Sequence, residues 1–288
     1  MAQLLVNGLI AGGIYALIAI GYTMVYGVLH FINFAHGEIV TAGAFFFYSL
    51  HVLWGWNPVF SFFLSVLLCG GLGCLIERGA YRPLRYASRI SSLVTAIGVS
   101  VILQNGLGAI FGFDPKSISG SGEAVVYSIR NAFITRPQVA VLASAGGLLA
   151  GLFVFLKWTY IGTLIRATGD DLSAAVSTGI PVDRTVSVTF FVGSLLAGTA
   201  GILVGTLQDI QPTMGLPFGI KAFTAAVVGG IGSVPGAVIG GLFIGMAENL
   251  GAWIFPTGYK DAFAFLVLIL FMLFRPRGIL GKSALHNG

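Results

Sequence analysis

Polar residues interrupt an otherwise apolar chain at a short segment that joins two long apolar stretches, His30-Phe-Ile-Asn33-Phe-Ala-His36-Gly37-Glu38. A polar group without a partner at membrane depth costs several kcal/mol, so such side chains usually face a bundle interior or a wet cavity. A break between half-helices also exposes helix ends that can meet ligand charges. We therefore predict that Asn33, His36, Gly37 and Glu38 belong to a discontinuous helix lining a substrate pathway. The alternatives are a tight turn with a hydrogen-bonded structural histidine, and a proton relay.

A second segment is rich in glycine. Six glycines lie between positions 229 and 241, and Gly245 continues the series. Glycines let helix backbones approach closely, which is the alternative interpretation for the later ones. Glycine and proline between 232 and 236 can instead break the helix at depth, so we predict a re-entrant pathway element containing Gly229, Gly230, Gly232 and Ser233. The acidic residue Glu248 lies in the next apolar stretch, where an intramembrane acid is a functional-site hypothesis by default.

A third segment, Gly162 to Pro181, is more polar and contains a short helical pattern. Asp170 or Asp171 suits a helix N-cap, and Leu172, Ala175 and Val176 fall on one face. Gly179 followed by proline marks the stop. A helix of about two turns is too short to be stable alone, so it must dock on another surface. We predict that it inserts into a cytoplasmic motor protein, with packing on its own bundle or on lipid as the alternative.

The elements that position these segments are apolar. The chain has 288 residues, of which 56% are apolar and only 9% charged, against about 25% charged in ordinary soluble domains. This composition argues against soluble enzymes, nucleic-acid binders, disordered chains and disulfide scaffolds. About 20 apolar residues of helix span a bilayer core. We predict an all-α polytopic membrane protein with about nine helices, some short or broken: 3–29, 37–54, 58–77, 90–112, 138–157, 186–207, 221–234, 236–254 and 260–274.

The basic residues predict which way the bundle faces. Ten of the 15 Lys and Arg residues lie at 77–89, at 157–184 and in the tail, and five lie on the opposite side if nine spans alternate. Cytoplasmic loops are enriched in Lys and Arg, so the ten-residue side is predicted to be cytoplasmic. The N-terminus is then outside and the C-terminus cytoplasmic. Residues 1–288 form one transmembrane domain, with 113–137 as an extracytoplasmic loop and 158–185 as a cytoplasmic coupling loop.

Several motifs carry a specific resemblance across nearly the whole chain. They resemble motifs of branched-chain amino acid ABC transporter permeases of the LivH type. The matching runs are 22–27, 32–38, Ile76 to Arg85, Thr95 to Gly98, Lys221 to Ser233 and Pro276 to Gly281. The family's cytoplasmic loop matches 162–179, so the resemblance implies ATPase coupling through Arg166, Asp170, Asp171, Leu172, Ala175 and Gly179.

The resemblance also implies partners and a location. It implies a bacterial inner-membrane importer in which this permease pairs with a second, homologous permease, two cytoplasmic ATPase subunits and a periplasmic binding protein. ATP and Mg²⁺ would be bound by the ATPase subunits; we expect no cofactor, catalytic residue or metal site in this chain, and contacts with membrane lipid but not nucleic acid. Related permeases move urea, short amides or other amino acids. An ion-coupled secondary transporter using Glu38, His36 or Glu248 is a less favoured alternative, and an intramembrane enzyme is least favoured.

Overall fold

The computed structural model describes residues 2–85, 87–118, 126–129, 132–254, 260–275 and 278–281. Long apolar runs fold into helices because a helix satisfies its own backbone groups. The helices are α1 (Ala2–Leu29), α2 (His36–Phe47), α3 (Pro58–Ile76), α4 (Arg89–Phe111), α5 (Arg136–Trp158), α6 (Tyr160–Asp170), α7 (Leu172–Ser177), α8 (Val182–Leu207), α9 (Gly215–Gly229), α10 (Val234–Ile254) and α11 (Lys260–Phe274).

Short elements join these helices. Two π-helical segments, η1 (Tyr48–Leu53) and η2 (Glu77–Tyr81), extend α2 and α3, and η3 (Arg82–Leu84) is a 3₁₀ turn. The strands β1 (Val126–Ile129) and β2 (Ala132–Thr135) form an antiparallel hairpin in which Val126 faces Thr135. This hairpin lies in the segment 113–137, which was predicted as an extracytoplasmic loop, and it is an exception to the predicted all-α fold. The other regular elements in the described residues are helices, as predicted, apart from an isolated bridge between Lys116 and Ile210.

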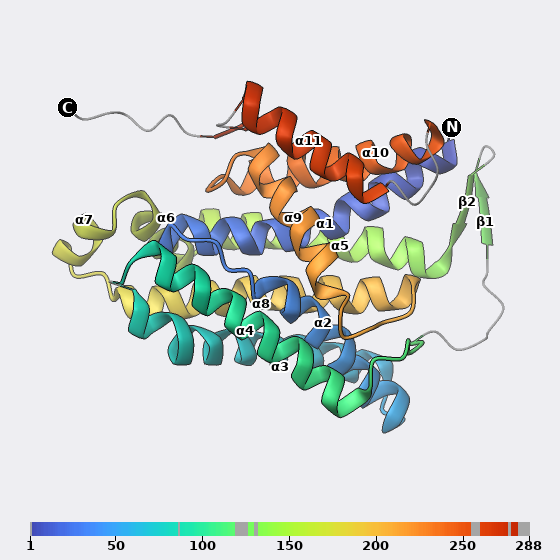
Figure 1. Ribbon diagram of the computed structural model, residues 1–288, viewed down its shortest axis with the longest axis horizontal. Coiled ribbons are helices and arrows are strands. Elements are labelled where there is room, and N and C mark those ends of the chain that lie inside the picture. Colours follow the sequence, from blue (N-terminus) through green and yellow to red (C-terminus); the bar gives the residue numbers. More distant parts are fainter. Residues whose placement is uncertain are drawn as a thin grey trace.

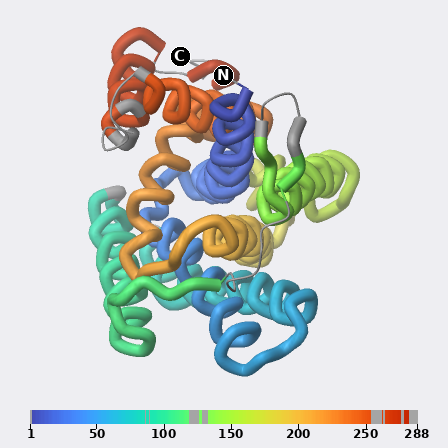
Figure 2. The backbone as a smooth tube through the Cα atoms, turned by 90° about the vertical axis from the view of Figure 1, so that its right-hand side faces the viewer, coloured from blue at the N-terminus to red at the C-terminus, as the bar shows by residue number. Residues whose placement is uncertain are grey.

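Most helices run roughly parallel, with α7 at one end of the bundle and the hairpin at the other, while α9 crosses them steeply (Figure 1). Figure 2 looks along the bundle and shows α1 and α8 near its middle, with α4 and α5 on opposite flanks. The central helices are more buried than the flanking ones: 78% of the most apolar stretch of α8 and 67% of that of α1 are buried, against 17% for α4 and 22% for α5. The flanking helices therefore present their apolar faces to lipid or to a partner.

Six helices in the described part of the chain are long and apolar enough to cross a membrane, and Gly215–Gly229 and Ala264–Phe274 are shorter apolar helices. The protein is thus a helical, multi-pass membrane protein. The predicted helix 37–54 is divided between α2 and η1, because the hydrogen-bond pattern changes after Phe47.

The predicted boundaries of the helix 221–234 were wrong at both ends. The helix begins at Gly215, because the residues before Lys221 are uncharged and Pro217 lies in the first turn, where its missing N–H is harmless. Lys221 does not mark a boundary because Glu248 neutralises its charge within the bundle. The helix ends at Gly229, and the predicted break before α10 is present.

Small residues hold α1 against α10. A Cβ on Gly12 would lie 2.8 Å from Leu242 Cα, and a Cβ on Gly245 would overlap the backbone of Gly12. Gly241 approaches Ala16 in the same way. The spacing of four residues on both helices is the small-residue pattern that allows close backbone contact in membranes. It fixes the N-terminal helix beside a helix that is almost the last in the chain.

Candidate functional site

The first predicted break places a helix start deep inside the bundle. The helix α1 ends at Leu29, and His30 takes a left-handed conformation with φ of 56°. The chain then returns along α1, and α2 begins at His36, whose ring occupies the space that a side chain at Gly21 would need. Gly21 lies eight residues before the end of α1, which is about 12 Å of helix. The start of α2 is therefore buried inside the bundle, and its place in a substrate pathway stays a prediction.

The start of α2 meets the start of α9. A Cβ on Gly215 would lie 2.6 Å from Gly37 O, and Gly219 makes a similarly close approach to Gly37. Neither helix has a side-chain N-cap: Ala35 precedes α2 and Met214 precedes α9. Two helix N-termini, each carrying a partial positive charge, thus converge on one buried point. This is the arrangement by which broken helices in transporters meet anionic groups.

Glu38 lies at this point. Its side chain is buried; Oε1 accepts a hydrogen bond from Ser100 of α4 at 3.2 Å, and Oε2 would lie 2.7 Å from a Cβ on Gly215. The two helix ends favour its negative charge. Buried carboxylates are costly without such compensation. The carboxylate is therefore held between two helices rather than on one.

Other polar atoms around the break are buried. Asn33 Oδ1 accepts a hydrogen bond from Tyr81 at 2.5 Å, and the ring of His36 packs edge-on against Tyr22. Within the described residues, several buried atoms lack a well-formed hydrogen bond: Asn33 Nδ2, His36 Nε2, Glu38 Oε2, Thr41 Oγ1 and Thr23 Oγ1. Such atoms are rare in native interiors, and a ligand or a water molecule is their usual partner.

The second predicted break, between α9 and α10, is a joint at which the chain supplies hydrogen-bond partners for both helix ends. Ser233 Oγ accepts a hydrogen bond from Gly236 N and so caps α10. At the other side, the turn 278–281 lies against the end of α9, where Ile279 and Leu280 donate to the carbonyls of Val228 (2.8 Å) and of Gly229 (2.9 Å). Gly230 and Gly232 adopt φ of 105° and 91°, which favour glycine. The structure gives these residues a packing role, and their place in a pathway stays a prediction.

A small cavity lies between the two breaks. Its volume is about 10 Å³, and it is lined by Tyr22, Tyr26, Ile32, Phe223, Ala226 and Ile231. Ile32 belongs to the first break and Ile231 to the second. The space is far too small for an amino acid, because buried sites for small molecules measure about 300–1,000 Å³. This cavity is therefore not a substrate site in the structure described.

The predicted coupling segment contains two helices rather than one. The additional helix is α6, which Thr159 caps by accepting a hydrogen bond from Gly162 N. Arg166 donates to Leu156 O and so braces α6 against α5. The second helix, α7, matches the predicted short helix. Asp170 ends α6, and Asp171 is the N-cap of α7.

The details of α7 agree with its predicted start and stop. Asp171 Oδ1 accepts hydrogen bonds from Ser173 N at 2.8 Å and from Ala174 N at 2.9 Å. Ala175 is buried and Leu172 half-buried, while Val176, predicted on the same face, is 59% exposed. Gly179 has a φ of 79° and ends the helix. The helix projects at the end of the bundle (Figure 1).

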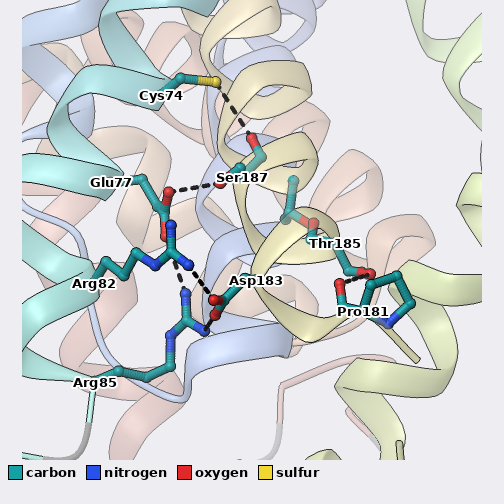
Figure 3. A network of polar contacts seen from close by, with 9 residues as sticks. Cys74, Glu77, Arg82, Arg85, Pro181, Asp183, Thr185 and Ser187 are labelled. Carbon is teal, nitrogen blue, oxygen red and sulfur yellow. Dashed lines mark hydrogen bonds and ion pairs between the residues drawn. The ribbon is translucent and has the colours of Figure 1, made fainter. Parts of the chain in front are cut away.

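An ion-pair network beside α7 was not predicted from the sequence. Arg85 donates to Asp183 and, at 3.0 Å, to Glu77, while Arg82 also donates to Asp183 (Figure 3). Ser187 donates to Glu77 at 2.7 Å. The network ties η2 and η3 to the first turns of α8. The arginines indicate only the orientation of the bundle, and Asp183 is an ordinary acidic residue in the first turn of a helix, so no local pattern indicates the pairing.

A second, buried ion pair joins α9 to α10 near the other end of the bundle. Lys221 Nζ of α9 lies 3.0 Å from Glu248 Oε1 of α10, and Tyr15 of α1 donates to Glu248 Oε2 at 2.7 Å. The acid that the sequence marked as a functional hypothesis is thus paired and links three helices. A paired buried charge of this kind is explained by structure alone.

Comparison with known proteins assigns the chain to a family. Residues 4–272 match the family described as "Branched-chain amino acid transport system / permease component". The chain belongs to this family. As a member of this permease family, it is 42% identical to BraD of Pseudomonas aeruginosa, named a high-affinity branched-chain amino acid transport system permease protein, over 99% of this chain and 97% of that protein.

Two further relatives of this permease span comparable lengths. The chain is 40% identical to LivH of Escherichia coli K12, which carries the same descriptive name, over 99% of this chain and 97% of LivH. It is 29% identical to a probable branched-chain amino acid transport permease protein of Methanocaldococcus jannaschii, over 97% of this chain and 92% of that protein. No solved structure matches. The identification made from the motifs is confirmed, and the chain is a permease subunit of an ABC importer.

Proposed function

We propose that this permease forms half of the translocation pathway of an ATP-driven importer for branched-chain amino acids in a bacterial inner membrane. The observation that carries this proposal is the meeting of two uncapped helix N-termini around Glu38. An amino acid carries a carboxylate, which suits the helix N-termini, and an ammonium group, which suits Glu38. The surrounding apolar walls suit a branched side chain.

Replacement of Glu38 tests the pathway. In the importer reconstituted in vesicles, Glu38→Gln is expected to lower uptake about tenfold or more, because a hydrogen bond to a charged group contributes about 1.5–3 kcal/mol. The yield of assembled complex is expected to change little. Ser100→Ala is the matched control, since it removes the partner of Glu38 and keeps the carboxylate. Normal uptake by Glu38→Gln would reduce this acid to a structural residue and contradict the proposal.

The helix α7 is the proposed contact with the motor. Two cytoplasmic ATPase subunits would bind ATP and Mg²⁺, a second permease would complete the pathway, and a periplasmic binding protein would deliver substrate. The projection of α7 beyond the bundle supports this role, as do its cap and its exposed Val176. Movement of α7 by the ATPase subunits would favour the inward-facing or outward-facing state of the permease.

Substitutions in α7 test the coupling. Asp171→Ala removes a cap worth about 1 kcal/mol, and Leu172→Arg places a charge where an apolar side chain would dock. Both variants are expected to lower uptake while ATP hydrolysis by the complex continues. Ser173→Ala is the control, because only its backbone N–H bonds to Asp171. Unchanged uptake in Asp171→Ala and Leu172→Arg would remove the coupling role.

The proposed topology has nine spans with the N-terminus outside and the C-terminus cytoplasmic. Nine requires that α2 with η1, α9 and α11 cross in addition to the six longer helices. Arginines gather with α7 around one groove, namely Arg78, Arg82, Arg85 and Arg184. Gln3 near the N-terminus bonds to Phe133 of the hairpin, at the other end. The enrichment of arginine supports a cytoplasmic location for the α7 end.

A further inference from the structure

An open groove beside α7 is not used by the proposed pathway. Its volume is about 1240 Å³. One side is formed by Leu172, Ser173 and Val176 of α7, and the other by the ends of α3 and α8. Part of its polar wall is the network in Figure 3. The groove thus connects the end of the bundle to the surface between two membrane helices.

The wall of the groove carries an excess of positive charge. Arg78, Arg82, Arg85 and Arg184 line it, while the acids are Asp183 in the wall and Glu77 behind it. Arg82 and Arg85 are engaged by these two carboxylates. Four cations therefore face two anions, so the groove favours a ligand with a negative charge of one or two.

One donor in the groove is buried. The side chain of Arg85 is 6% exposed, and its Nε makes no hydrogen bond to the residues that the structure describes. The two terminal nitrogens of the same guanidinium are bonded to Asp183 and Glu77. A buried donor of this kind costs free energy unless an acceptor reaches it. The Nε atom itself is buried, so a ligand in the groove meets the exposed arginines Arg78 and Arg184 instead.

The deeper wall of the groove is apolar. It is formed by Cys74 of α3 and by Val188 and Phe191 of α8, and the ring of Phe191 packs against Gly70 of α3. The neighbouring surface of α3 is apolar as well, since Leu75 is 70% exposed. A ligand here meets arginines at one end and hydrocarbon at the other. Water-soluble anions have no hydrocarbon chain that could contact the apolar wall.

We propose that this groove binds an anionic phospholipid, with the phosphate at Arg78 and Arg184 and an acyl chain along Val188 and Phe191. Basic pockets between membrane helices on the cytoplasmic side bind such headgroups. The lipid would lie against α7 and against the network that joins η2 to α8. Its binding would therefore brace the helix proposed to contact the motor. The site itself rests on the groove's geometry and charge, and not on the transported substrate.

Lipid titration tests the site directly. The full-length permease, alone and in the assembled importer, is titrated in neutral detergent with phosphatidylglycerol or phosphatidylcholine, and bound lipid is measured by native mass spectrometry. We expect a preference for phosphatidylglycerol in both preparations. Arg78→Gln and Arg184→Gln are each expected to weaken that preference about fivefold, and together about 25-fold. These arginines lie outside the ion-pair network, so the variants are expected to fold.

The controls separate a specific lipid site from a general attraction of anions to basic residues. Arg136→Gln removes an exposed arginine at the start of α5 and is expected to leave the preference unchanged. Absence of any preference in the native permease, or equal preference in the double variant, would overturn the site. Displacement of lipid by inorganic phosphate at similar concentrations would identify a soluble anion instead. Loss of lipid on assembly with the ATPase subunits would assign the groove to them and overturn the proposal.

Discussion

The two breaks in the helices differ in how their polar groups are satisfied. At the first, α2 starts without a side-chain cap, and Glu38 and Thr41 bring buried oxygens that lack well-formed bonds within the described chain. At the second, Ser233 caps α10, and the turn 278–281 bonds to the last carbonyls of α9. Both breaks contain glycine and both were predicted to line a pathway. The second break is a joint held by the chain's own hydrogen bonds, whereas several buried polar atoms at the first lack well-formed bonds within the described residues.

The difference teaches that a helix break alone does not indicate function. Backbone groups freed by a break need partners in a membrane. Where the chain supplies those partners itself, as Ile279 and Leu280 do, the break is explained by structure. Where polar groups are buried without them, a substrate or water is the natural partner. Three substitutions sharpen this contrast, and each compares a position with a matched control.

The largest effect is expected at the joint. Gly230→Ala would place a Cβ in overlap with Gly281 N, at a φ that alanine adopts only with strain. The combined strain and overpacking predict a loss of about 2–4 kcal/mol, measured as a lower thermal midpoint in detergent. Gly232→Ala has a similar positive φ but open space around it, and about 1 kcal/mol is expected. Equal losses would mean that the turn 278–281 does not hold the joint.

A smaller effect is expected where the first break is anchored. Tyr81→Phe removes the hydroxyl that donates to Asn33 Oδ1 and leaves the ring between Phe31 and Phe190. Loss of this buried bond is expected to cost about 1–2 kcal/mol in the same thermal assay. Tyr160→Phe is the control, because Tyr160 is 76% exposed. A stability equal to the control would contradict a rigid anchor at this break.

The smallest effect on stability is expected beside Glu38. Thr41→Val replaces a buried hydroxyl that lies with Glu38 Oε2 against Gly215, so it is expected to change the stability by less than about 1 kcal/mol. If the first break is functional, uptake falls although stability changes little. The control is Thr189→Val, since Thr189 Oγ1 already donates to Thr185 O at 2.8 Å. Unimpaired uptake in Thr41→Val would weaken the contrast between the two breaks.

The sequence predicted what local patterns determine. Long apolar runs predicted the membrane helices, Asp171 and Gly179 predicted the limits of α7, and the polar segment around His36 predicted a helix start at depth. These features depend on neighbours in the chain, because capping, helix breaking and membrane span are local properties.

Long-range pairings could not be predicted in the same way. Glu77, Arg85 and Asp183 are far apart in the sequence, and their meeting depends on how α3 packs against α8. The start of α9 was missed because the charge of Lys221 indicates the end of an apolar helix. Only the structure shows that Glu248 pairs with this charge inside the bundle. The hairpin was missed because the segment 113–137 was interpreted only by its polarity. Arrangement in space decides each of these features, and a single sequence does not record it.

The close packing of α1 against α10 has a consequence for how the protein is made. Because Gly12 has no side chain, the surface of α1 is low at this point, and α10 covers it by bringing its backbone close. The ribosome releases α1 first and completes α10 only near residue 254. At about 5–20 residues per second, α1 waits roughly 10–50 seconds in the bilayer before this partner emerges. A chain that stops before α10 keeps a first helix whose small-residue face has no partner from α10.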